Sequence, residues 1–117
     1  MLLMIGEKKY MGLIVDAKGK KAVPALAPRI LDEAGVELYT AAFVSQDAIK
    51  ERGVAAYGTS LNEAKSEERV GDHPLVIKAL RADGSDIVIT NADASPFTGG
   101  EQSFAFLAEG RVLIVID

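Results

Sequence analysis

Short apolar runs, separated by polar breaks that contain glycine, recur along the 117-residue chain. Most of these runs are apolar at nearly every position and do not alternate with polar residues, which is typical of strands covered on both faces. Four of them start at or just after Gly35, Gly53, Gly84 and Gly110. Because glycine readily takes the positive φ that ends a helix, each glycine predicts a junction from helix to strand.

Four such junctions predict alternating helices and strands, and therefore a mostly parallel sheet. We expect strands at residues 10–16, 36–44, 54–57, 86–90 and 112–116, with residues 2–5 as a short first strand or a disordered start. We expect helices at residues 24–34, 45–52, 61–69 and 74–80, and a short one at 104–107. Ser45 and Ser60 are the expected N-caps, and Ser60 with Glu63 fits a capping box.

The predicted fold is a single α/β domain covering residues 1–117, with three layers: a mostly parallel sheet of about five strands and helices on its faces. The alternative is a smaller α+β sheet, in which residues 10–23 form one hairpin and residues 104–117 another. The chain ends directly on a predicted strand, which suits either a complete domain or a piece cut at an edge.

Composition narrows the class of protein. A hydrophobic fraction of 49% supplies a real core, and aromatic residues make up 6%. The net charge is −4 and the basic residues are scattered, which disfavours nucleic-acid binding. There are no cysteines, so disulfides and thiolate metal sites are excluded. The apolar start of the chain is too short for a membrane span or signal peptide, so we predict a cytoplasmic protein without a membrane partner.

Candidate chemistry concentrates in residues 91–100, where a buried strand breaks into a polar, glycine-containing loop. Ligands of open α/β sheets bind at the carboxyl ends of the strands. Backbone amides freed at a following helix would favour an anion. Thr59 and Ser60 also follow a predicted strand. The residues expected to contact the ligand are Asn91, Asp93, Ser95, Thr98, Gly99, Gly100, Asp16 and Ser45.

Other candidate sites carry weaker signals. Asp16 and Asp93 both follow buried strands and would suit Mg²⁺ if they met, although Asp is also a common turn and capping residue. His73, the one histidine, lacks the spacing of a metal motif and reads as a loop residue or a lone general base. No metal or other cofactor is therefore expected, and the sequence leaves open whether the protein is an enzyme.

Three functions remain. The leading one is a small domain with a crevice for a small polar or anionic ligand. The second is a non-enzymatic scaffold or accessory subunit that forms a homo-oligomer, for instance a homodimer through residues 112–116 if that strand lies at a sheet edge. The third is a Mg²⁺-dependent enzyme that acts on a phosphorylated substrate.

Overall fold

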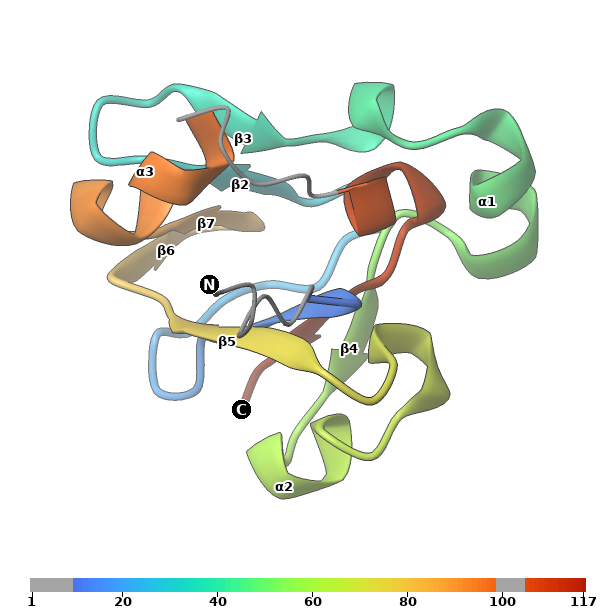
Figure 1. The fold of residues 1–117 in the computed structure, drawn as a ribbon. Helices are drawn as coiled ribbons and strands as arrows, with labels where there is room; N and C mark the ends of the chain where they lie inside the picture. Colours follow the sequence, from blue (N-terminus) through green and yellow to red (C-terminus); the bar gives the residue numbers. More distant parts are fainter. Residues whose placement is uncertain (1–9, 99–104) are drawn as a thin grey trace, which may run out of the picture.

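Two four-stranded sheets face each other in the computed structural model, which describes residues 10–98 and 105–117 (Figure 1). The Cα radius of gyration is 13.6 Å, close to the value of about 13 Å for a compact 100-residue domain. The protein therefore mixes helices and strands in one compact body, as an α/β or α+β protein does. Its strands form two sheets and not the single sheet of about five strands that we predicted.

The parallel sheet has the strand order β4-β8-β1-β5, and all its pairs are parallel. Its members are β1 (Gly12–Asp16), β4 (Ala56–Gly58), β5 (Pro74–Lys78) and β8 (Val112–Val115). The pattern of continuous apolar runs correctly predicted β1 and β8, which lie at the centre of this sheet. Because β8 is flanked by β4 and β1, it does not lie at a sheet edge, and the condition for a homodimer through residues 112–116 is not met.

The mixed sheet has the order β3-β2-β7-β6 and joins two antiparallel hairpins through a parallel β2–β7 pair. Its members are β2 (Arg29–Leu31), β3 (Glu37–Tyr39), β6 (Arg81–Asp83) and β7 (Asp86–Val88). Arg29 of β2 links its two neighbouring strands, because its guanidinium contacts Asp86 of β7 at 2.7 Å and Glu37 of β3 at 2.9 Å. The alternative α+β prediction placed its hairpins at residues 10–23 and 104–117, whereas the observed hairpins are β2–β3 and β6–β7.

Helices in the described ranges are short. They are α1 (Gln46–Arg52), α2 (Leu61–Ala64) and α3 (Asn91–Thr98), with 3-10 helices η1 (Ala41–Phe43), η2 (Glu68–Val70) and η3 (Ala105–Glu109). Ser45 Oγ accepts from Ala48 N and Ser60 Oγ accepts from Glu63 N, so both predicted N-caps are confirmed. Within these ranges, no helix has the length and apolarity needed to cross a membrane.

The main core fills the space between the two sheets. Leu13, Val15 and Ile114 face Ile30 and Ile87 there, all with at most 1% of their surface exposed. A second, smaller cluster lies on the outer face of the parallel sheet, where Ala64 and Val70 of the α2–η2 segment cover Ile14, Leu113 and Val115. Sheet residues are thus buried on both faces, which explains the continuous apolar runs in the sequence.

Gly12 permits this second layer to pack closely. A Cβ built on Gly12 would lie 2.5 Å from both Cα and O of Val70. Real Cβ atoms do not approach backbone so closely, so the η2 backbone rests on a glycine surface of β1.

Two predicted helices are strands in the structure. Residues 74–80 begin with β5. Ile77 belongs to the core and Leu75 packs against it, while Val76 and Lys78 are exposed. This is the two-residue period of a strand, and Pro74 stands at its first position on a sheet edge, where its missing N–H costs nothing.

The predicted helix at residues 24–34 is instead β2 followed by a hairpin turn. Asp32 Oδ1 accepts from the backbone N of both Ala34 and Val36, at 2.9 Å each. This side-chain turn ends at Gly35, whose φ is +88°. The predicted positive φ was correct, but it serves a hairpin and not a helix C-cap.

Candidate functional site

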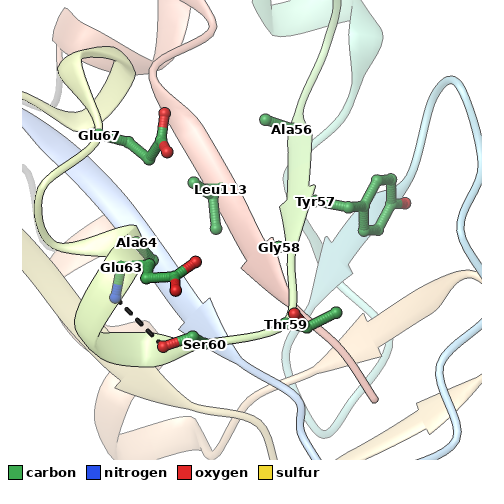
Figure 2. Close-up of a pocket in the computed structure, with 9 residues that line it drawn as sticks. All are labelled: Ala56, Tyr57, Gly58, Thr59, Ser60, Glu63, Ala64, Glu67 and Leu113. Atoms are coloured by element: carbon green, nitrogen blue, oxygen red, sulfur yellow. Dashed lines mark hydrogen bonds between the residues drawn. The ribbon is translucent and has the colours of Figure 1, made fainter.

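An open depression with a volume of about 140 Å³ lies between β4 and the α2–η2 segment, on the outer face of the parallel sheet (Figure 2). We call it the β4–α2 cleft. Its lining consists of Ala56, Tyr57, Gly58, Thr59, Ser60, Glu63, Ala64, Glu67 and Leu113. Leu113 lies between the two walls, with β4 on one side and the glutamates on the other. Part of the cleft therefore adjoins the carboxyl end of a parallel strand, where ligands of such sheets are expected.

The chain builds this cleft from three local features. Gly58 carries no side chain, and a Cβ placed there would lie 3.6 Å from Leu113 Cδ2, in ordinary van der Waals contact. Ser60 starts α2 immediately after β4 and so sets the helix against the strand. Glu63 lies on α2, and Glu67 has an extended backbone at the start of η2, so the α2–η2 segment brings both glutamates to the lining of the cleft.

Charge and polarity of the lining favour a cationic group. Figure 2 shows the carboxylates of Glu63 and Glu67 on one side of Leu113. Among the residues that the structure describes, no lysine or arginine is part of the lining, although Lys18 Nζ donates to Thr59 O at its edge. Tyr57 extends from the opposite face of β4, away from the glutamates. An apolar floor with two carboxylates on its rim suits an alkyl chain that ends in an ammonium or guanidinium group.

The predicted ligand loop is a helix in the structure. Asn91 to Thr98 form α3, while Gly99 and Gly100 lie outside the described residues. The turn chemistry that we read as a loop instead starts this helix, because Thr90 Oγ1 accepts from Asp93 N at 3.1 Å. Ser95 is exposed on α3.

A carboxylate of the protein itself already occupies the start of α3. Glu33 Oε2 accepts from Asn91 N at 2.8 Å, and Asn91 Oδ1 accepts from Glu33 N at 3.1 Å. Glu33 comes from the β2–β3 hairpin, so this pair docks α3 on the mixed sheet. An anion at the helix N-terminus is favourable, as expected, but here the chain supplies it.

The remaining predicted contacts are not gathered around this helix. Asp16 ends β1 in the parallel sheet, and its Oδ1 accepts from Lys18 N at 3.1 Å. Ser45 caps α1, and its backbone N donates to Ala108 O just before β8. Asp16 pairs with Val115 at the end of β8, whereas Ser45 lies near the start of β8. Asp16 and Ser45 therefore lie at opposite ends of the parallel sheet.

His73 and the two aspartates take local structural positions in the part of the chain that the structure describes. The ring of His73 stacks on Tyr10, with centroids 5.2 Å apart and an interplanar angle of 11°. Among residues 10–98 and 105–117, no group of three or more His, Asp or Glu side chains is placed to hold a metal ion. Asp16 and Asp93 take up the local turn and helix-start positions that are common for Asp.

Sequence reasoning missed the acidic wall of the cleft. Thr59 and Ser60 were among the expected strand-end residues, but Glu63 and Glu67 were interpreted as part of a solvated helix. The available signal was two glutamates in the short segment that directly follows a strand and an N-cap. What the sequence did not give was the position of Leu113, more than forty residues away, as the floor between them.

A comparison with protein families identifies a similar domain. The sequence profile of a family described as Treponema pallidum Tp0624, second domain, matches residues 12–117. The search of curated proteins finds no match to this chain.

Proposed function

The chain belongs to the family of the Treponema pallidum Tp0624 second domain, and we propose that it is a non-catalytic binding domain that takes a cationic group in the β4–α2 cleft. The observation that carries the proposal is the pairing of the Glu63 and Glu67 carboxylates with the apolar floor at Leu113. The family description refers to one domain of a protein, which supports a role as a module. The predicted cytoplasmic location stays a prediction.

The proposed ligand differs in charge from the anion that we expected from sequence. A carboxylate or phosphate entering the cleft would meet two like charges on its wall, which is unfavourable. An alkylammonium group would instead lie between these carboxylates, with its carbon chain on Leu113 and Ala56. The proposal keeps the predicted crevice beside a strand end, but it replaces the predicted anionic ligand with a cationic one.

The first experiment is an amide NMR titration with n-butylammonium, with n-butanol and butyrate as neutral and anionic analogues of similar size. A cleft of this size and exposure is expected to bind the amine with a dissociation constant of about 1 mM, or −4 kcal/mol. We expect shifts at residues 56–60, 63 and 67 with butylammonium alone. Butanol or butyrate producing the same shifts would refute a cationic site.

Two variants localise the binding. Glu63→Gln combined with Glu67→Gln removes both charges and should abolish the shifts at residues 56–60, while Glu51→Gln, on the exposed face of α1, should leave them unchanged. Gly58→Val places carbon atoms against Leu113 and should block the cleft without requiring a positive φ. An unaltered titration of the double variant would refute the site.

A protein-contact role is a second candidate, because one leucine is almost fully exposed. Leu26 has 95% of its surface accessible, and Val23 beside it has 55%. The segment is held on both sides, since Val23 N donates to Gly84 O and Ala25 N donates to Tyr57 Oη. An exposed leucine at a restrained position is a preorganised contact residue, and this favours the scaffold or accessory role.

A further inference from the structure

Two complementary features lie beside the same edge strand of the parallel sheet. One is the β4–α2 cleft, with its acidic wall and apolar floor. The other is the segment of residues 20–26, KKAVPAL, which carries two lysines at one end and the exposed Leu26 at the other. Ala25 N donates to Tyr57 Oη at 3.0 Å, so this segment is attached to β4 itself.

The segment cannot fill the cleft of its own chain. Tyr57 extends from the face of β4 opposite the glutamates, and it holds Ala25 on that side (Figure 2). β4 is the outermost strand of its sheet, in the order β4-β8-β1-β5. One edge therefore presents a basic and apolar protrusion on one face and an acidic and apolar hollow on the other.

We propose that residues 20–26 of one copy of this chain dock in the β4–α2 cleft of a second copy, and that the exchange is reciprocal. Leu26 covers the floor at Leu113, and Lys20 and Lys21 face Glu63 and Glu67 of the partner. This inference deepens the proposed function, since it names the molecule that supplies the cation. It also replaces the predicted homodimer through β8 with one through the edge of β4.

Charge, size and symmetry support the second copy as the occupant. The opposite signs of the two surfaces would attract. Residues 56–60 span about 13 Å of wall at the rise of an extended chain, and Lys21 to Leu26 reach at most about 17 Å, so both anchors reach one cleft. In a two-fold interface, each copy must offer the surface that the other copy binds. This chain carries both the protruding segment and the cleft beside the same edge strand, so two copies can exchange them.

The test is the molar mass in solution, measured by light scattering and sedimentation from about 1 to 100 µM, since a contact made by a few residues of each copy binds weakly. We expect a concentration-dependent dimer. Leu26→Asp should abolish it, as should Glu63→Lys combined with Glu67→Lys. Val76→Asp, at an exposed apolar position on the opposite edge strand β5, should leave it intact. A wild-type chain that is monomeric at 100 µM would overturn the proposal, as would a dimer that survives both sets of changes.

Charge exchange identifies the contact independently of folding defects. The Lys20→Glu, Lys21→Glu variant and the Glu63→Lys, Glu67→Lys variant should each be monomeric alone. When mixed, they should form a heterodimer detectable by native mass spectrometry, because each of the two clefts then faces a segment of opposite charge. Failure to form the heterodimer, with both variants folded by circular dichroism, counts against the docking.

The same samples separate this inference from the proposed function. If the amine titrates the cleft of monomeric Leu26→Asp while the wild type is also monomeric, the cationic site stands and the second copy is ruled out as its occupant. If the wild type dimerises through residues 20–26 but butylammonium neither binds nor competes, the docking stands and the cleft is not a general cation site.

Discussion

Arg69 is expected to be the largest single polar contributor to stability. Its guanidinium donates to three backbone carbonyls: Nε to Gly110 O at 2.8 Å, Nη1 to Arg52 O at 2.6 Å and Nη2 to Gly53 O at 2.8 Å. Arg52 and Gly53 end α1, whose last carbonyls lack partners within the helix. Gly110 leads into β8. One half-buried side chain therefore joins η2, the end of α1 and the entry to β8, and burial lowers its pKa.

The cost of removing these bonds follows from their number and charge. A hydrogen bond to a charged group contributes about 1.5–3 kcal/mol, and the half-exposed setting allows water to replace part of it. Arg69→Met, which keeps most of the apolar contact, should therefore lower the free energy of unfolding by about 3–5 kcal/mol. With a slope of about 1.5 kcal/mol/M, the urea midpoint should fall by about 2–3 M.

Urea unfolding followed by circular dichroism measures this, and two variants isolate the cause. Lys50→Met removes a positive charge from the last turn of α1 and should change stability by about 0.5 kcal/mol or less. Arg69→Lys keeps the charge but not the planar fork, and should recover less than half of the loss. A loss below about 1 kcal/mol for Arg69→Met, or equal losses for Arg69→Met and Lys50→Met, would refute the reasoning.

Two further predictions follow from close contacts in the core. Gly12→Ala should destabilise the protein by about 3 kcal/mol or more in the same urea assay, because its Cβ would overlap the backbone of Val70, whereas Gly58→Ala, with room at 3.6 Å, should cost about 1 kcal/mol or less. Burial raises the pKa of Tyr39, which donates to Val54 O, to about 12. Since the unfolded pKa is about 10, its stabilising effect is complete below pH 10 and is lost as pH rises towards 12. Ultraviolet titration should show a component near pH 12 that Tyr39→Phe removes, and ionisation of Tyr39 near pH 10 in the folded protein would contradict this.

The sequence by itself determined the local features of the protein. Ser45 and Ser60 cap helices as predicted, because a cap depends on residues within three positions of each other. The glycines at positions 35, 53, 84 and 110 all have positive φ, since that conformation is a property of the residue and its immediate turn. The two central strands, β1 and β8, were also readable, because burial on both faces leaves a continuous apolar run.

Only the tertiary structure decided how these pieces are shared between sheets. β2 is three residues long and β5 begins with proline, so each was too short or too ambiguous for its period to separate strand from helix. The candidate site depends on the same long-range choices. Glu63, Glu67 and Leu113 form one cleft because β8 pairs beside β4, and Glu33 fills the start of α3 because a hairpin far away in sequence packs there. Such pairings are fixed by the burial of whole faces, which no local window of sequence contains.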